Sequence, residues 1–125
     1  MAETSGKQEY LVGVDFGGTK ILAAVFSTHL KCQGRAKMST KAQRGPDAVI
    51  ERIARCVQDA VDECALDLKR IKGVGIGAPG AVDPESGKVI FAPNLSWEDV
   101  PLKKELEKAL GVPVFVENDG NICTL

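Results

Sequence analysis

Histidine, aromatic residues and clustered positive charge are all scarce in this chain of 125 residues. It has one histidine and 5% aromatic residues, and its 16 Lys and Arg are balanced by 17 Asp and Glu. A net charge of -1 without a basic cluster argues against a nucleic-acid surface or a surface for anionic membranes. No apolar run is long enough to span a bilayer, and the polar start MAETSGKQEY contains no apolar signal region. We therefore expect a cytoplasmic protein.

Closely paired cysteines are also absent. Cys32, Cys56, Cys64 and Cys123 lie far apart and form no C-x-x-C motif, and His29 falls in a predicted polar turn. Zinc sites need several Cys or His ligands at short spacings, so we expect no zinc site within this chain. The cysteines are expected to be reduced thiols that fill small apolar sites.

The sequence is rich enough in apolar residues, at 44%, to form the core of one domain. Alternating and helical apolar patterns predict a mixed sheet with helices packed on it, which is an α/β fold. Strands are expected at 10–15, 20–26, 32–39, 71–77 and 113–117, a small hairpin at 82–84 and 88–92, and helices from 46 to between 66 and 69, at 101–110, and from 118 onward.

One stretch, VGVDFGGTKILAAVF, places two apolar runs on either side of a glycine pair and so predicts a β-hairpin. Asp15 precedes Gly17 and Gly18 in this turn, and Thr19 and Lys20 follow them. Glycine amides can point at an anion, and a carboxylate beside an anion requires a cation between them. This pattern favours Mg²⁺ and a nucleotide phosphate. The alternative is an ordinary two-residue hairpin turn.

Two phosphate-binding motifs match the sequence only in part. Gly75, Gly77 and Gly80 fit the dinucleotide pattern G-x-G-x-x-G, but a predicted extended segment follows them instead of the helix that would hold a pyrophosphate. The segment 13–20 resembles a P-loop, but its Thr-Lys order is reversed and a strand follows it. We reject both motifs.

Polar residues recur where predicted strands end, which is where ligands bind in open α/β sheets. The first group is Asp15 with the glycine turn, the second is the Ala78-Pro79-Gly80 segment with Asn94, and the third is Asn118 with Asp119. Asn94 could also be a plain turn residue, and Asn118 and Asp119 could cap a helix. Because the three groups occur together, we predict a ligand site.

Four segments, DFGGTK, GIGAPGAVD, APNLSW and VPVFVENDGN, occur in this order, and together they resemble the N-terminal lobe of the ROK family of sugar kinases and repressors. The resemblance runs from about Leu11 to Leu125 and is strongest to bacterial glucokinase-like members. It implies an actin-like ATPase (ribonuclease H-like) fold, truncated after the last strand, with residues 1–10 as a flexible N-terminus and 11–125 as the lobe. It also implies ATP and Mg²⁺ as cofactors, with phosphate transferred to a hexose, glucose being favoured.

The resemblance implies functional roles for individual residues at the matching positions. Asp119 corresponds to the catalytic base, which accepts the proton of the sugar hydroxyl. Sugar contacts are implied for Gly80, Asn94, Asn118 and Asp119, and contacts to the ATP phosphates and Mg²⁺ for Asp15, Gly17, Gly18, Thr19 and Lys20. Asp15 would act through water, and Lys20 matches a residue that is frequent in the family.

The second lobe of such kinases, with its zinc site and much of its adenosine pocket, is not among these residues. We therefore expect the chain alone to bind sugar weakly and to phosphorylate it poorly or not at all. An exposed sheet edge and an uncovered face predict self-association into a homo-oligomer or aggregates. One alternative is a non-catalytic sugar-binding or interaction module. A repressor of the same family is disfavoured. The family's repressors resemble proteins that carry a DNA-binding helix-turn-helix ahead of the first strand, whereas only about ten polar residues precede that strand here.

Overall fold

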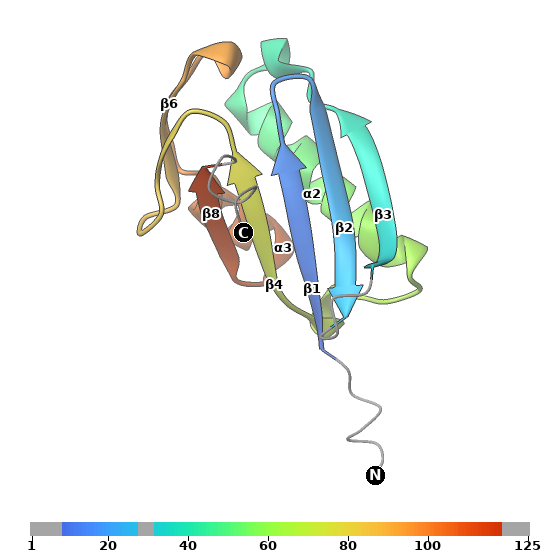
Figure 1. The fold of residues 1–125 in the computed structure, drawn as a ribbon. Coiled ribbons are helices and arrows are strands. Elements are labelled where there is room, and N and C mark those ends of the chain that lie inside the picture. Colours follow the sequence, from blue (N-terminus) through green and yellow to red (C-terminus); the bar gives the residue numbers. More distant parts are fainter. Residues whose placement is uncertain (1–8, 28–31, 119–125) are drawn as a thin grey trace.

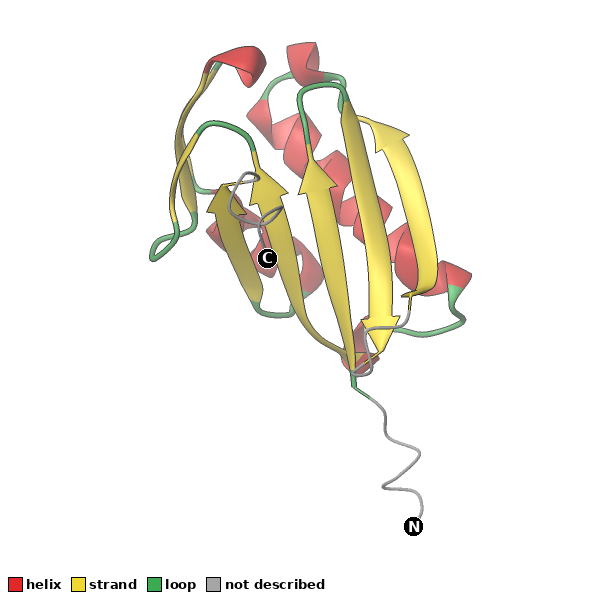
Figure 2. Ribbon diagram, in the orientation of Figure 1, coloured by secondary structure: helices red, strands yellow, loops and turns green. Residues whose placement is uncertain are grey.

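The computed structural model of the chain describes residues 9–27 and 32–118, and all that follows concerns these residues (Figure 1). They form a five-stranded sheet in the order β3-β2-β1-β4-β8 and a separate three-stranded sheet in the order β5-β6-β7. Helices lie on one face of the larger sheet, as Figure 2 shows. The predicted α/β architecture with a mixed sheet is confirmed.

The first three strands form the predicted antiparallel meander. They are β1 (Tyr10–Phe16), β2 (Lys20–Ser27) and β3 (Cys32–Ser39). In β1 and β2 the side chains alternate between the buried and the open face, so Val14 and Ile21 enter the core while Asp15 and Leu22 lie opposite each other on the open face.

Two further strands, β4 (Ile71–Ala78) and β8 (Val114–Asn118), run parallel to β1. Strand β4 lies between β1 and β8, with Asp15 opposite Gly77 and Gly77 opposite Glu117. The carboxyl ends of β1, β4 and β8 therefore meet at one edge of the sheet. This is the arrangement on which the predicted ligand site depends.

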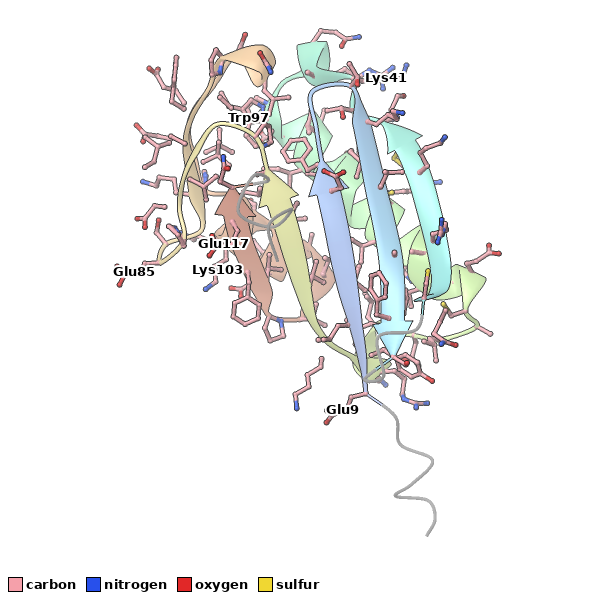
Figure 3. All side chains as sticks on the ribbon, viewed as in Figure 1. Glu9, Lys41, Glu85, Trp97, Lys103 and Glu117 are labelled. Atoms are coloured by element: carbon pink, nitrogen blue, oxygen red, sulfur yellow. The ribbon has the colours of Figure 1, made fainter. Side chains whose placement is uncertain are left out.

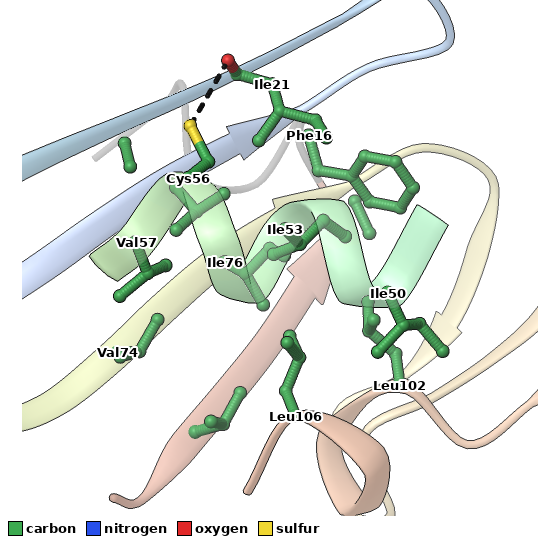
Figure 4. Close-up of a cluster of buried hydrophobic side chains, with 14 of the residues drawn as sticks. Phe16, Ile21, Ile50, Ile53, Cys56, Val57, Val74, Ile76, Leu102 and Leu106 are labelled. Atoms are coloured by element: carbon green, nitrogen blue, oxygen red, sulfur yellow. Dashed lines mark hydrogen bonds between the residues drawn. The ribbon is translucent and has the colours of Figure 1, made fainter. Parts of the chain in front are cut away.

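Two amphipathic helices cover the buried face. They are α2 (Pro46–Glu63), which begins with proline in its first turn, and α3 (Leu102–Leu110). Ile53 of α2 and Leu106 of α3 are fully buried, as is Ile76 of β4, in the apolar cluster drawn in Figure 4. Such burial supplies the main favourable term in folding.

The predicted end of the first long helix, between Leu66 and Lys69, is wrong. The helix ends at Glu63, because Ala65 adopts a left-handed backbone conformation with φ of 58°. The N–H of Leu66 then donates to the carbonyl of Val61 at 3.2 Å, which closes the helix end in the manner of a Schellman motif. A 3₁₀ turn, η2 (Leu68–Arg70), leads from there into β4.

The small sheet contains one strand more than the predicted hairpin. The hairpin is β5 (Ala81–Asp83) and β6 (Lys88–Ala92), and β7 (Trp97–Val100) pairs with β6 after the 3₁₀ turn η3 (Pro93–Leu95). The sequence WEDV has two acidic residues between two buried ones, so its apolar pattern is too short to indicate a strand.

The other face of the large sheet is not covered by any described helix, and it faces the viewer in Figure 1. Leu11, Leu22 and Phe115 expose 42%, 40% and 61% of their surface there. Within the described segments, neither helix is both long and apolar enough to cross a lipid bilayer.

Candidate functional site

The turn between β1 and β2 is held in shape by hydrogen bonds to its carbonyl groups. The N–H of Gly17 donates to the carbonyl of Lys20 at 2.9 Å. Thr40, which directly follows β3, donates from Oγ1 to the carbonyl of Gly17 at 2.8 Å and from its N–H to the carbonyl of Thr19 at 2.9 Å. The turn is thus fixed from both sides, with Thr19 and Lys20 exposed.

Asp15 lies one residue before the end of β1 on the open face of the sheet. Its side chain is exposed, and Gly77 of β4 is its register partner on one side while Leu22 of β2 is its partner on the other. A glycine neighbour leaves space beside the carboxylate. Asp15 is therefore available to a ligand at the carboxyl ends of the strands.

The turn between β4 and β5 requires glycine at position 80. Gly80 has φ of +85°, and a Cβ atom there would collide with the carbonyl oxygen of Phe91 and approach the Cα of Ala92 to 2.9 Å. The carbonyl of Gly80 accepts a hydrogen bond of 2.6 Å from Nδ2 of Asn118 at the end of β8. Two of the predicted sugar-binding residues are thus joined directly.

Asn94 is brought to the glycine turn by the small sheet. It lies in η3 and is exposed, and its Cβ is 3.7 Å from where a Cβ on Gly18 would be. Ser96, which ends η3, has a left-handed backbone with φ of 57° that turns the chain into β7. The predicted sugar-binding and phosphate-binding segments therefore adjoin.

The structure brings described members of the predicted site together at two places: Asn94 lies beside Gly18, and Asn118 is hydrogen-bonded to Gly80. Asn118 does not start a helix as expected: it is the last residue of β8 and pairs with Ala78. The predicted catalytic base, Asp119, lies outside the described residues. The two motif matches rejected from the sequence are indeed followed by strands, β5 after Gly80 and β2 after the glycine turn.

Two residues near the site were not singled out by sequence reasoning. Thr40 is fully buried, and Trp97 is 1% exposed, with its ring centroid 5.2 Å from that of Phe16 at the end of β1. Figure 3 labels Trp97 among the side chains. The indole Nε1–H of Trp97 has no hydrogen-bond partner among the described residues. A threonine in a polar segment carries no signal in the sequence, whereas a lone tryptophan beside a predicted ligand segment could have been noticed.

A hollow on the open face of the large sheet adjoins the candidate site through Asp15. Its volume is about 750 Å³, and its lining includes Gly13, Ala24 and Gly75, whose small size creates it. Asp15 lies on its lining, with Lys37 of β3.

The cysteines match their predicted roles only in part. Cys56 is a fully buried free thiol, and burial, reinforced by the charge of Asp59, raises its pKa. Cys64 is half-buried, but Cys32 is exposed, so the prediction of an apolar site is wrong for Cys32. Cys123 and His29 lie outside the described residues. Burial also raises the pKa of the Cys64 thiol, so neither Cys56 nor Cys64 is suited to act as a nucleophile.

Comparison with known proteins places this geometry in a family. The ROK family profile matches residues 11–125. The glucokinase of Thermotoga maritima is 39% identical over 116 residues, which is 92% of this chain and 35% of that protein. The xylose repressor of Bacillus subtilis is 30% identical over 118 residues, 92% of this chain and 29% of the repressor.

A solved structure of a ROK family glucokinase from Streptomyces griseus, in complex with glucose and AMPPNP, has a TM-score of 0.82 to this chain at 36% identity. The alignment covers 92% of this chain and 35% of that one, so the chain spans about a third of the length of these relatives. The actin-like ATPase fold expected from the sequence is confirmed by this similarity. With the family profile matched from Leu11 to Leu125, the chain belongs to the ROK family.

Proposed function

We propose that this chain is the N-terminal lobe of a hexose kinase that transfers phosphate from ATP to a sugar hydroxyl, with glucose as the favoured substrate. The observation that carries the proposal is the meeting of strand-end segments at one edge of the sheet. Gly18 adjoins Asn94, Asn118 is bonded to Gly80, and Asp15 lies level with Gly77. The glucokinases among the relatives support the same function.

The proposed division of labour follows the chemistry of the groups. Asn94 and Asn118 offer amides that can donate to and accept from sugar hydroxyls. Asp119, directly after Asn118 in the sequence, would orient the attacking hydroxyl and accept its proton. Positioning of this kind accounts for most of the catalysis in phosphoryl transfer, because the protein has little covalent chemistry to perform.

The residues of the glycine turn fit a nucleotide with Mg²⁺. Mg²⁺ in such sites is held by one or two carboxylates together with phosphate oxygens and water, and it neutralises phosphate charge. Asp15 supplies one exposed carboxylate, and no cluster of three or more His, Cys, Asp or Glu suited to a metal occurs within residues 9–27 and 32–118. As the family resemblance implies, Asp15 would hold the ion through water, next to phosphates bound at Gly17, Gly18 and Thr19. We propose only a supporting role for Lys20.

A coupled assay of ADP release with ATP, Mg²⁺ and a panel of hexoses tests this function. It should be run on the 125-residue chain and on any longer chain that contains it, because the relatives are about three times as long. Turnover should depend on the hexose, and Asp119→Asn should lower it by about 10²–10⁴-fold while sugar binding is retained. Unchanged turnover in Asp119→Asn would contradict the assignment of the base.

A second candidate function is sugar binding without phosphorylation, as a sensing or interaction module. The xylose repressors among the relatives favour it. Calorimetry with the same hexoses separates the two, because a non-catalytic module would bind sugar without ADP release in either length of chain. Turnover would exclude this second function.

A further inference from the structure

Thr40 is a buried polar residue to which neither the sequence nor the family match gives a role. It is 0% exposed, and with Ser27 it is one of the two buried polar or charged residues in the described part of the chain. Burying a hydroxyl is unfavourable unless it forms a hydrogen bond. The Thr40 hydroxyl meets this need by donating to the carbonyl of Gly17 at 2.8 Å, across 23 residues of sequence.

That hydrogen bond fixes the direction of one peptide group. In a planar trans peptide the C=O of one residue and the N–H of the next point in opposite directions, and the described chain has no cis peptide bond. Because the Gly17 carbonyl points to Thr40, the N–H of Gly18 points away from Thr40. No described residue accepts a hydrogen bond from the Gly18 N–H.

The main chain of Thr40 holds the other side of the same turn. Its N–H donates to the carbonyl of Thr19 at 2.9 Å, while the N–H of Gly17 is occupied by the carbonyl of Lys20. The carbonyl groups of Gly17 and Thr19 are thus both held toward Thr40. The negative ends of their dipoles therefore face away from the side of the turn to which the Gly18 N–H points. An anion can bind where a main-chain N–H is exposed and the neighbouring carbonyl groups point away from it, as they do on this side of the turn.

We propose that Thr40 is a positioning residue of the phosphate-binding turn, which holds the Gly17–Gly18 peptide so that the Gly18 N–H faces a nucleotide phosphate. The inference rests on the proposed function, because it takes the turn to be the phosphate site. Thr40 itself does not touch the nucleotide.

The test compares Thr40→Val, which has nearly the same shape but lacks the hydroxyl, with Thr40→Ser, which keeps it. Both retain the main-chain N–H that holds Thr19. Ser27→Ala is the matched control, because it removes the other buried hydroxyl at the opposite end of β2. The readout is the backbone amide signal of Gly18 in ¹H–¹⁵N NMR spectra during titration with Mg²⁺ and AMPPNP, which detects even weak binding.

We expect the Gly18 signal to shift and saturate in the wild type, in Thr40→Ser and in Ser27→Ala. In Thr40→Val the apparent affinity should fall roughly three- to tenfold, since the orientation supplied by one hydrogen bond is lost. The signals of the buried core should stay in place in all variants.

Each failure has a distinct meaning. If Thr40→Val binds as the wild type does, the inference is wrong and the proposed phosphate site stands. If Ser27→Ala weakens binding as much as Thr40→Val, the effect is general destabilisation and the inference is again wrong. If no signal between Gly17 and Lys20 shifts in the wild type at millimolar nucleotide, the phosphate site is wrong and the inference with it.

Discussion

Replacing Gly80 with alanine is expected to destabilise the chain by about 2–5 kcal/mol. Gly80 has φ of +85°, where an L-residue costs roughly 1–2 kcal/mol. The added Cβ would also collide with the Phe91 carbonyl and lie 2.9 Å from the Cα of Ala92, and both of these are main-chain atoms of β6 that cannot move away as a flexible side chain could. Overpacking of this kind typically costs about 1–3 kcal/mol more.

Gly111→Ala is the control that separates these two costs. Gly111 ends α3 with φ of +73°, but a Cβ there would meet nothing within 4 Å. Gly111→Ala should show only the backbone cost of about 1–2 kcal/mol. In both variants the lower conformational entropy of the unfolded alanine chain reduces the loss of stability by a similar amount. The difference between the two variants therefore measures the collision with β6.

Urea denaturation followed by tryptophan fluorescence gives both free energies of unfolding. The chain has one tryptophan, Trp97, and its 1% exposure makes its emission sensitive to unfolding. If Gly80→Ala costs no more than Gly111→Ala, the close approach of β6 to the turn at Gly80 does not constrain the fold, and our account of this turn is refuted.

Substitutions at two further positions, each with a comparison variant, test contacts that hold the fold together. Glu107→Ala should cost about 1–3 kcal/mol in urea denaturation, because Glu107 Oε2 accepts a hydrogen bond of 3.0 Å from the N–H of Val114 and its loss leaves that donor without this partner. Glu105→Ala in the same helix should change stability by less than about 0.5 kcal/mol, and an equal loss in both variants would contradict the role of Glu107. The stability of Trp97→Phe in thermal denaturation should stay within about 1 kcal/mol of wild type. The smaller ring loses packing, but the variant also removes a buried N–H that has no described partner, and the two effects offset each other. Trp97→Ala should cost about 3–5 kcal/mol. A phenylalanine variant as unstable as the alanine variant would mean that the indole N–H is satisfied in solution.

Local patterns in the sequence predicted the elements whose signal is contained in neighbouring residues. The β1–β2 hairpin follows from two apolar runs around a glycine pair, and α2 follows from its apolar period and from Pro46 at its start. Errors arose where backbone conformation or strand pairing, and not an apolar pattern, decided the outcome. Helix α2 ends early because Ala65 is left-handed, and β7 forms by pairing with β6, which neither the length nor the pattern of WEDV indicates.

The candidate site shows the same division. Positions at predicted strand ends identified Asp15, Gly80, Asn94 and Asn118, because polar residues after apolar runs are visible in the sequence. Thr40 could not be identified in this way, because its role is a hydrogen bond to a main-chain carbonyl 23 residues away. Such a bond depends on the position of β3 beside β2 and not on any side chain of the turn.

The sequence by itself determined which faces of the strands are buried, where the long helices lie and which residues stand at the strand ends, because periods of two and of 3.6 residues are local properties of the chain. Tertiary structure alone decided that β4 lies between β1 and β8. Parallel strands are joined by long crossovers, so their order follows from how α2 and α3 pack against the sheet and from no short segment. That order sets Asp15 level with Gly77 and joins Asn118 to Gly80, and so brings polar positions that are separate in sequence to one edge of the sheet.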